Sequence, residues 1–469
     1  MEKRDVVVIG GGPAGYVAAI RAAQLGGKVT LVEEAKLGGI CLNRGCIPTK
    51  FMLRSVEAYQ SLKTAERYGI SVSGANLELT KMQGGKNEVI SALTSGVKGL
   101  LSGNKVEVLN GRAKLTSSRQ IAVGSAQGKK ETITADKIIL ATGAKPIVLP
   151  IPGADSPDIM SVDDLLEVEE LPKSLVIIGG GVVGVEMATV FAKLGSRVSL
   201  VEMMPHCLPA QDDEIALVLE AVLRDEGIQV CCSARVSRID DTDGGKAVVF
   251  SEGDAGQKIE AEAVAIAVGY RPNVDGLGLE ECGVAVEKGG IQVNEKMETS
   301  VPNIYAAGDV IGGMMLAYVA IAEGMAAADN ARGLDSKLDY HAIPQCIYTL
   351  PEVASVGLTE QEATAQGHEI QIGRFPFMAN GMAAIVGEQR GLVKIITEPK
   401  YGQILGVHII GPQATCLIAE AAMAIKLEST VDDILDMIHA HPSLSEAIWE
   451  AAADVKGEAI HILSRKKSG

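Results

Sequence analysis

Short runs of apolar residues alternate with longer helical stretches along most of the chain. Residues 6–9 and 175–178 are apolar runs, mostly of β-branched residues, that predict buried strands, and a segment with the length of a helix follows each of them. From residue 345 onward the pattern changes to short strands and amphipathic helices, such as residues 414–430. The sequence therefore predicts an α/β fold in its first part and, at its end, an α+β domain that packs or pairs.

The first part contains an internal repeat. Residues 5–34 (DVVVIGGGPAGYVAAIRAAQLGGKVTLVEE) and 174–203 (SLVIIGGGVVGVEMATVFAKLGSRVSLVEM) both read as strand, G-x-G-x-x-G loop, helix and second strand with a closing acid. The last glycine and this acid are 18 positions apart in both copies. The repeated residues are Gly10, Gly12, Gly15 and Glu33 in the first copy, and Gly179, Gly181, Gly184 and Glu202 in the second.

Each part of this repeat has a physical reason. The first glycine permits a tight turn, the second lets the backbone approach a pyrophosphate, and the third lets the helix lie close to the strand. The helix N-terminus offers N–H groups and positive partial charge to phosphates, and the acid accepts hydrogen bonds from a ribose. The two copies therefore predict two Rossmann-like domains, each binding a dinucleotide.

Three further landmarks suggest how the chain divides. One strand ends at Ala141-Thr142-Gly143 before a Pro-rich connector (146–157), a similar strand ends in the second copy near Gly269, and another ends at Gly308-Asp309. We therefore expect four domains. They span residues 1–148 and 149–272 (the two dinucleotide domains), 273–343 (a central domain completing the first site) and 344–469 (the interface domain).

Size and charge exclude several classes of protein. With 469 residues the chain can bury several cores, and its formal net charge of −16 argues against nucleic-acid and anionic-membrane partners. We see no uncharged, glycine-free apolar stretch long enough for a transmembrane helix, and the first strand is too short for a signal-peptide core. We expect a reducing, cytoplasmic location, where a disulfide is more often catalytic than structural.

The segment CLNRGCIPTK, residues 41–50, holds two cysteines five positions apart. On a regular helix, Cys41 and Cys46 would be rotated by about 140° from each other, too far for a disulfide. The segment therefore cannot be a regular helix throughout, and Gly45 is the residue that lets it distort. A zinc site or a structural bridge remains open at this point, but the spacing is poor for zinc and a redox pair is favoured.

Together these motifs, with HAHPSLSEAIWEAA at 439–452, resemble the pyridine-nucleotide-disulfide oxidoreductase family over essentially the whole chain. Within it the closest resemblance is to members that oxidise dihydrolipoamide with NAD. The resemblance implies FAD on the first glycine loop and NAD on the second, with no metal. It also implies that Asp309 contacts the flavin's ribityl chain. The other implied cofactor residues are the two glycine loops and their acids, Thr142, Gly143, Gly269 and Lys50.

The resemblance also assigns roles at the reacting centre. Cys41 would exchange with the dithiol substrate and Cys46 would face the flavin. His441 would act as the base, oriented by Glu446, since the His-Pro-x-x-x-Glu spacing selects it over His439. Lys50 and Glu186 would pair near flavin N5. The other histidines and cysteines are interpreted as packing or surface residues, including the vicinal pair Cys231-Cys232.

The partners implied by the resemblance are dihydrolipoamide on a lipoyl carrier protein, a second copy of the chain, and a 2-oxoacid dehydrogenase or glycine cleavage complex. Positions that depart from the commoner family pattern are Met314, Tyr318, Val319 and Tyr270. Three alternatives are less favoured. Mercuric reductases carry a C-terminal cysteine pair, which the segment HILSRKKSG does not contain. Glutathione reductases usually carry basic residues after the closing acid of the second copy, whereas Met203, Met204 and Pro205 follow Glu202 here. A docking subunit without turnover would not need the Cys, His and Glu set.

Overall fold

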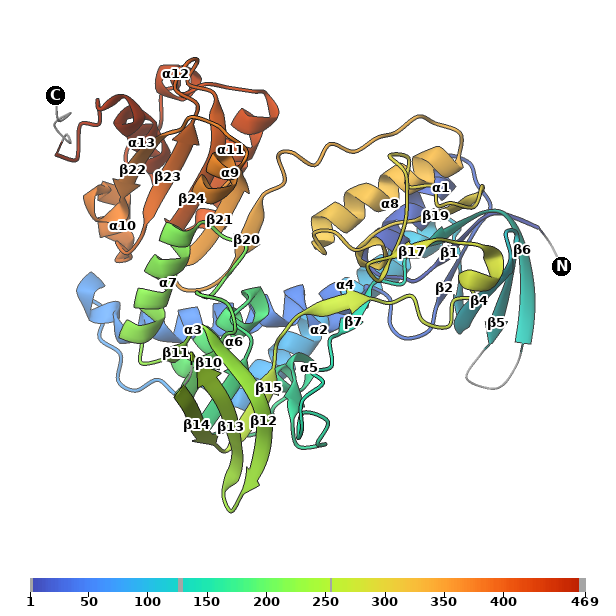
Figure 1. The fold of residues 1–469 in the computed structure, drawn as a ribbon, viewed down its shortest axis with the longest axis horizontal. Helices are drawn as coiled ribbons and strands as arrows, with labels where there is room; N and C mark the ends of the chain where they lie inside the picture. Colours follow the sequence, from blue (N-terminus) through green and yellow to red (C-terminus); the bar gives the residue numbers. More distant parts are fainter. Residues whose placement is uncertain (1–2, 125–129, 254, 464–469) are drawn as a thin grey trace. The chain divides into compact units, whose positions relative to one another are not determined.

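The computed structural model describes residues 3–124, 130–253 and 255–463 (Figure 1). Its contacts divide the chain into two compact units, which are considered one at a time. The first contains residues 1–52, 78–148 and 269–339, and the second contains residues 53–77, 149–268 and 340–469. Among the described residues, no helix is both long and apolar enough to cross a membrane.

The first unit is built on a parallel sheet that continues into an antiparallel one. β1 pairs in parallel with β2 and β6, and β3 and β19 extend the sheet on either side. The first half of β6 pairs antiparallel with β5, which pairs with β4. The strands are β1 (Arg4–Ile9), β2 (Val29–Glu33), β3 (Glu107–Asn110), β4 (Arg112–Ser117), β5 (Gln120–Gly124), β6 (Lys130–Leu140) and β19 (Ile304–Ala306).

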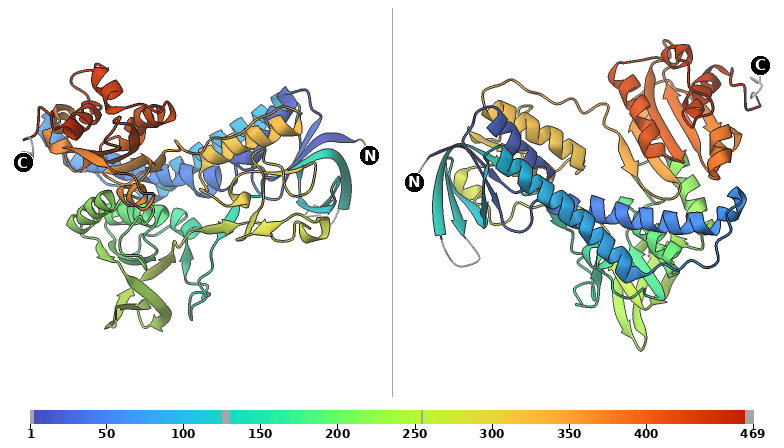
Figure 2. Two further views of the ribbon diagram at one scale, coloured as in Figure 1. Left: turned by 45° about the horizontal axis from the view of Figure 1, so that its top comes forward. Right: turned by 180° about the vertical axis from the view of Figure 1, so that it is seen from behind.

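Two helices lie together against this parallel sheet. α1 (Pro13–Gln24) and α8 (Ala317–Ala331) run side by side in Figures 1 and 2 and share one hydrophobic core with β1 and β2. Their approach requires a glycine, because a Cβ on Gly324 would stand 2.3 Å from the carbonyl oxygen of Ala14. A third helix, α4 (Leu79–Gly103), contacts α1 as well.

The second unit repeats the parallel design. Its five-stranded sheet has the order β11-β10-β9-β15-β8, and an antiparallel sheet of β12, β13 and β14 follows β11 in the chain. The strands are β8 (Met160–Ser161), β9 (Ser174–Ile178), β10 (Arg197–Val201), β11 (Gln229–Cys231), β12 (Ala234–Thr242), β13 (Gly245–Glu252), β14 (Ala255–Ala261) and β15 (Ala263–Ile266). Together with the first sheet, this confirms the predicted pair of Rossmann-like folds.

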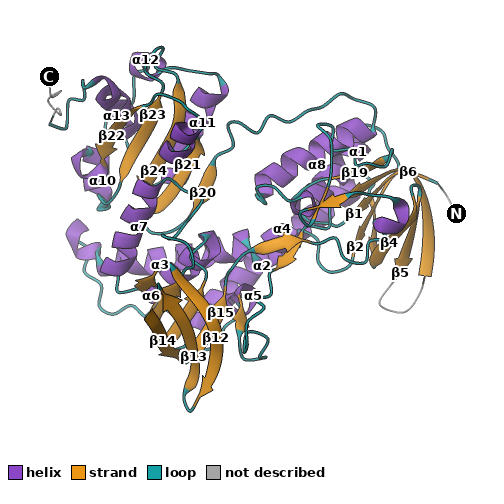
Figure 3. Ribbon diagram, in the orientation of Figure 1, coloured by secondary structure: helices purple, strands orange, loops and turns teal. Residues whose placement is uncertain are grey.

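The C-terminal part of the second unit is an antiparallel sheet with helices packed on it (Figure 3). The strand order is β20-β21-β24-β23-β22. α11 (Ala414–Lys426) packs on β21 and β24, whereas α13 (Glu446–Lys456) packs on β22 and β23. The strands are β20 (Gln345–Ile347), β21 (Glu352–Gly357), β22 (Gln371–Pro376), β23 (Leu392–Thr397) and β24 (Ile404–Gly411). The α+β domain predicted from residue 345 onward is confirmed.

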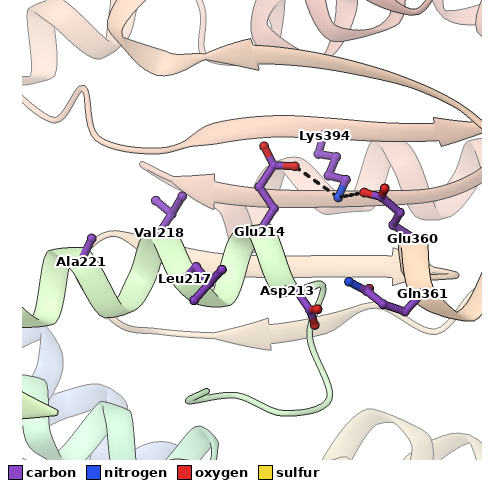
Figure 4. Close-up of a pocket in the computed structure, with 8 residues that line it drawn as sticks. All are labelled: Asp213, Glu214, Leu217, Val218, Ala221, Glu360, Gln361 and Lys394. Carbon is purple, nitrogen blue, oxygen red and sulfur yellow. Dashed lines mark hydrogen bonds and ion pairs between the residues drawn. The ribbon is translucent and has the colours of Figure 1, made fainter. Parts of the chain in front are cut away.

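A buried ionic cluster joins this sheet to α7 (Asp213–Asp225) within the second unit. The ammonium of Lys394, on β23, lies 2.9 Å from both carboxylate oxygens of Asp212, 3.2 Å from Glu214 and 2.7 Å from Glu360. Figure 4 shows this lysine between Glu214 and Glu360 at the edge of a pocket. Lys394 is 1% exposed, so its charge depends on these carboxylates.

Candidate active site

The first glycine loop has the backbone that its sequence predicts. Gly10 has φ of +102°, and a Cβ there would stand 2.2 Å from the carbonyl oxygen of Ala141. A Cβ on Gly15 would stand 1.9 Å from the carbonyl oxygen of Gly10, so only glycine lets α1 pack this closely. The space around the middle glycine, Gly12, is open, and its nearest neighbour would be the Cα of Gly39 at 3.8 Å.

Glu33 is the last residue of β2 and is bound to this loop. One carboxylate oxygen accepts a hydrogen bond from the backbone N–H of Gly11 at 2.6 Å, and the other accepts one from Ala35 at 2.7 Å. The acid is therefore fixed where the strand meets the loop, as the repeat predicted.

The second glycine loop reproduces the first. Gly179 has φ of +111°, and a Cβ on Gly184 would stand 1.9 Å from the carbonyl oxygen of Gly179. Gly181 has no neighbour within 4 Å of its Cβ position. Glu202 accepts hydrogen bonds from the backbone N–H groups of Gly180 at 2.5 Å and Met204 at 2.7 Å. The internal repeat is thus a repeat of structure, with one loop in each unit.

Both loops fit the phosphates of a dinucleotide. α1 and α6 (Val182–Leu194) begin directly after their middle glycines, and no side chain caps either N-terminus. The first N–H groups of a helix have no partner within the helix, so they can bind a pyrophosphate over the open glycine. The residues present therefore fit one dinucleotide at each loop.

Thr142, Gly143 and Gly269 lie directly before two short strands of the first unit. β7 (Ala144–Pro146) and β16 (Tyr270–Pro272) pair antiparallel at this point within the first unit. The Thr142 hydroxyl donates to the carbonyl of Asn273 at 2.8 Å. Gly269, with φ of +98°, accepts a hydrogen bond from the backbone N–H of Ile147 at 3.0 Å. Gly143 accepts a hydrogen bond from the backbone N–H of Asn273 at 2.9 Å, so all three predicted residues join the segments around these two strands within the first unit.

The cysteine segment is broken at the predicted glycine. α2 (Gly39–Arg44) ends at Gly45, which has φ of −141° and ψ of −109°, and α3 (Cys46–Lys63) begins at the next residue. A Cβ on Gly45 would stand 3.1 Å from two atoms of Ile40, so a larger side chain would crowd the break. The expectation that this segment is not one regular helix is confirmed.

The break brings the two thiols together. All eight cysteines of the chain are thiols in the structure, and those of Cys41 and Cys46 are hydrogen-bonded to each other. This hydrogen bond, burial and the neighbouring Cys46 raise the pKa of Cys41, and Asp309 adds to the effect. The Lys50 ammonium acts in the opposite direction and lowers the pKa. Four predicted site residues are therefore gathered in the first unit.

Asp309 begins a short 3-10 helix, Asp309–Ile311, shortly after β19, which ends at Ala306. Burial raises the pKa of its carboxyl. The preceding residue, Gly308, has φ of +78° and donates its N–H to Glu323 at 2.7 Å. Glu323 lies on α8 and is buried. Its hydrogen bond with Gly308 fixes the turn that presents Asp309. Sequence analysis missed Glu323, because an acid within a helix has no motif.

His441 and Glu446 form a hydrogen-bonded pair in the second unit. Nδ1 of the imidazole lies 2.8 Å from a carboxylate oxygen of Glu446, the first residue of α13. The other carboxylate oxygen accepts a hydrogen bond from the backbone N–H of Ser443 at 2.8 Å. Burial raises the pKa of Glu446, but the hydrogen bonds from His441 and Ser443 outweigh it and hold the pKa below its usual range. An ionised carboxylate only accepts, so Nδ1 carries the proton and Nε2 is the basic nitrogen.

His439 has a different environment. Its side chain is 5% exposed and binds Glu420 at 2.9 Å, whereas the side chain of His441 is 79% exposed. The hydrogen bond to Glu420 raises the pKa of His439 and thereby favours the charged form of its ring. The same bond holds the ring in place. Of these two histidines, only His441 offers an accessible imidazole oriented by a carboxylate, which supports the choice made from the spacing.

Lys50 and Glu186 belong to different units. Glu186 on α6 is 1% exposed, and one of its oxygens accepts a hydrogen bond from the backbone N–H of Tyr348 at 2.9 Å. Lys50 lies on α3, one turn after Cys46, and acts on the pKa of Cys41. The pairing of this lysine with Glu186 remains a prediction.

Comparison with known proteins agrees with these features. Residues 4–324 match the family model described as pyridine nucleotide-disulphide oxidoreductase, and residues 343–452 match the dimerisation domain of that family. Dihydrolipoyl dehydrogenase from Bacillus subtilis is 43% identical, with 97% of this chain and 99% of the relative covered. The enzyme of the same name from Thermus scotoductus is 44% identical, with 99% and 100% covered. The crystal structure of LpdA from Mycobacterium tuberculosis has a TM-score of 0.88 at 30% identity, with 96% and 99% covered.

Proposed function

The chain belongs to the pyridine nucleotide-disulphide oxidoreductase family, and from this premise we propose that it is a flavoprotein that oxidises dihydrolipoamide to lipoamide with NAD. The substrate follows from full-length relatives, 43% and 44% identical, that are dihydrolipoyl dehydrogenases. The single observation that carries the chemistry is the contact between the thiols of Cys41 and Cys46 at the break between α2 and α3. A pair this close can form and break a disulfide with little movement.

The cysteines exchange with the substrate. A substrate thiolate attacks Sγ of Cys41 in the oxidised pair, the S–S bond to Cys46 breaks, and Cys46 leaves as a thiolate. The second substrate sulfur then displaces Cys41 from the mixed disulfide. The substrate leaves as a disulfide, and the cysteine pair holds the two electrons.

His441 supplies the base for this exchange. A thiol with a pKa of about 8.5 is mostly protonated at neutral pH, and only the thiolate attacks. Nε2 of His441 accepts the proton of the substrate thiol, while Glu446 holds the ring by Nδ1 and stabilises the imidazolium that forms. The base is near the C-terminus, in the dimerisation domain, and we propose that it serves the cysteine pair of the partner subunit in a two-fold homodimer.

The two glycine loops hold the coenzymes. The first loop would hold FAD, which would supply a two-electron acceptor for the cysteine pair, and the second loop would hold NAD, which would supply the final hydride acceptor. Glu33 and Glu202 are fixed to orient the two adenosine riboses. Asp309 lies close enough to Cys41 to raise its pKa, so it can hold the ribityl chain beside the redox pair.

The proposal extends to location, partners and domains. We propose a cytoplasmic enzyme that takes its substrate from a lipoyl carrier protein in a 2-oxoacid dehydrogenase or glycine cleavage complex. The proposed domain boundaries are 1–148, 149–272, 273–343 and 344–469. The sheets support this division. β1–β6 form one sheet of the first domain, which β19 of the central domain extends, β8–β15 form two sheets in the second domain, and β20–β24 form the sheet of the fourth.

A steady-state assay tests the substrate. Dihydrolipoamide, reduced glutathione and Hg(II) are assayed one at a time as substrates, each with either NAD or NADP as the coenzyme. The coenzyme is supplied oxidised for the two thiols and reduced for Hg(II). We expect turnover with dihydrolipoamide and NAD only. Cys41→Ser and Cys46→Ser should both abolish it while FAD stays bound, and only Cys46→Ser should remove the long-wavelength absorption that follows anaerobic addition of NADH. Near-normal dithiol turnover by Cys41→Ser would overturn the exchange role.

Complementation tests the shared site. Inactive Cys41→Ser and His441→Ala chains are mixed in equal amounts, unfolded and refolded together with FAD. Random pairing makes about half of the dimers mixed, and each mixed dimer has one complete site out of two, so about a quarter of wild-type activity returns. If the histidine serves its own chain, no site in the mixture is complete and activity stays near zero.

A further inference from the structure

Three potential metal ligands meet beside the second glycine loop. Cys207 lies in the loop after β10, Glu220 lies on α7, and Cys232 directly follows β11. The two sulfurs are 4.0 Å apart, and the thiol of Cys232 donates to a carboxylate oxygen of Glu220 at 3.0 Å. All three ligand atoms lie within 4.8 Å of one another. This is the only such group of three among the described residues.

The carboxylate is already oriented toward the sulfurs. Its Oε2 binds Arg224 at 2.9 Å, which leaves Oε1 to accept hydrogen bonds from the backbone N–H of Cys207 at 2.8 Å and from Cys232. Glu220 is 3% exposed and Cys207 is fully buried. A buried carboxylate beside two thiols is costly unless it is well paired, and the same oxygen can bind a cation where the Cys232 proton now lies.

The distances suit a tetrahedral cation better than a disulfide. Zinc-type ions bind thiolate sulfur at about 2.3 Å, so two sulfurs on one tetrahedral ion are about 3.8 Å apart. The observed 4.0 Å between Cys207 and Cys232 is close to this separation. A disulfide would require the sulfurs to approach to about 2.05 Å. Two thiolates and one carboxylate, with a fourth position for water, form a ligand set that zinc accepts.

We propose that Cys207, Glu220 and Cys232 bind one soft divalent cation such as Zn²⁺, at a site separate from the redox cysteines. Each thiol gives up its proton and forms a bond from sulfur to the metal, so binding releases two protons. The cluster has a charge of −1 before binding, from Glu220, and −1 afterwards, since two thiolates and the carboxylate offset the two positive charges. The buried site therefore holds the ion without adding net charge.

Binding would connect the second glycine loop to α7. Leu208, next to Cys207, donates its backbone N–H to the carbonyl of Gly180 at 2.8 Å. A Cβ on Gly180 would stand 3.1 Å from the sulfur of Cys207. A metal on this sulfur would restrain the loop from one side and the helix, through Glu220, from the other. An ion that binds only the folded state raises the midpoint of thermal unfolding.

Hydrogen bonding to Cys232 and burial raise the pKa of Cys207. Its thiolate is therefore costly without the ion, and the ion must compete with protons. Because both thiols bind as thiolates, we expect two protons to appear for each ion bound.

Cadmium titration tests the site in the full-length, FAD-loaded protein. Cys41→Ser/Cys46→Ser serves as the background, because it removes the redox pair as a competing ligand. The reduced, metal-stripped protein is titrated with Cd²⁺ under anaerobic conditions, and the ultraviolet thiolate-to-cadmium absorption is followed. We expect saturation at one Cd²⁺ per chain, release of two protons, a higher midpoint of unfolding and displacement by Zn²⁺.

Further variants in this background locate the ion. Cys207→Ala and Cys232→Ala should each abolish the absorption, and Glu220→Gln should weaken binding at least about tenfold. The matched control is Cys231→Ala, which removes the neighbouring thiol outside the cluster and should leave the titration unchanged. Absence of stoichiometric Cd²⁺ binding in the background protein itself would overturn the proposal, whatever the folding of the other variants. So would absorption that persists in a folded Cys207→Ala protein.

Discussion

The imidazole Nδ1 of His441 lies 2.8 Å from a carboxylate oxygen of Glu446, and the backbone N–H of Ser443 holds the other oxygen at the same distance. The acid thus has one partner for each oxygen, and the ring has one orientation in which Nε2 is basic. The pair combines a fixed acid with a histidine whose side chain is 79% exposed. This combination is what a base for an external thiol needs.

His441→Ala should reduce dithiol turnover by roughly 10²–10⁴, the usual range for the loss of a general base. Glu446→Ala should reduce it less, because the ring remains and only its orientation is lost. The measurement is kcat/KM for dihydrolipoamide at neutral pH. His439→Gln is the control and should keep the wild-type value. Equal losses in the His439 and His441 variants would contradict the assignment.

The wild-type protein should strongly prefer NAD over NADP, and Glu202→Ala should reduce this preference. The carboxylate is fixed by Gly180 and Met204, and from this position it accepts from ribose hydroxyls and repels a 2′-phosphate. The measurement is the ratio of kcat/KM for the two coenzymes. Glu33→Ala, the equivalent change at the first loop, should weaken retention of FAD and leave the ratio unchanged. Comparable kcat/KM for both coenzymes in the wild-type protein would contradict this role.

Lys50→Met should slow reduction of the flavin and shift its potential without loss of FAD. The Lys50 ammonium acts on Cys41 in the structure, and near flavin N5 it would stabilise negative charge on the reduced ring. Stopped-flow reduction by dihydrolipoamide measures the rate. Lys63→Met, at the end of the same helix, is the control and should reduce at the wild-type rate. An unchanged rate in Lys50→Met would exclude the lysine from the flavin site.

The features that could be predicted from the sequence are those set by local geometry. Gly15 and Gly45 hold backbone that a Cβ would bring against a residue only five positions earlier, and the spacing of each from its neighbours identifies it in the sequence. The positions of the closing acids can be predicted in the same way, because a strand of fixed length brings Glu33 and Glu202 to their loops. Such features depend on short stretches of consecutive residues.

The features that could not be predicted depend on contacts between distant segments. Lys394 and Asp212 are 182 positions apart, and nothing in either segment specifies the other. Cys207 and Cys232 carry no motif, and they meet only because β10 and β11 are neighbours in the sheet. In the sequence, Glu323 has no feature that distinguishes it from other acids on helices, and only the fold shows its hydrogen bond with Gly308. Tertiary pairing of this kind has no periodic signature in one sequence.

Lys394→Met should lower the free energy of unfolding by about 3–5 kcal/mol, the usual effect of removing one partner from a buried ionic cluster. The change leaves Asp212, which is fully buried, without its main counter-charge. Urea unfolding at neutral pH measures the effect. Lys296→Met removes a partly exposed pair with Asp335 and should leave the midpoint nearly unchanged. Equal midpoints for the two variants would show that the buried cluster adds no stability.

Because His408 is buried, it should lower the free energy of unfolding of the protein below about pH 6.5. The ring is 1% exposed, its Nε2 lies 2.9 Å from the carbonyl oxygen of Leu358, and its Nδ1 has no partner in the structure. Burial lowers the pKa of His408, and the nearby Lys394 ammonium adds to this, while Asp212, Glu362 and the carbonyl of Leu358 oppose it.

The sign of this effect follows from proton binding. Below the ordinary pKa of histidine, His408 of the unfolded chain binds a proton that the folded chain excludes, so the free energy of unfolding falls as pH falls. One such group contributes a slope of at most about 1.4 kcal/mol per pH unit. Urea unfolding between pH 7 and 5.5 should show a flatter dependence for His408→Gln, which keeps a donor for Leu358 but cannot titrate. His368→Gln, at an exposed position, should keep the wild-type slope, and a wild-type slope in His408→Gln as well would assign the acid sensitivity to other groups.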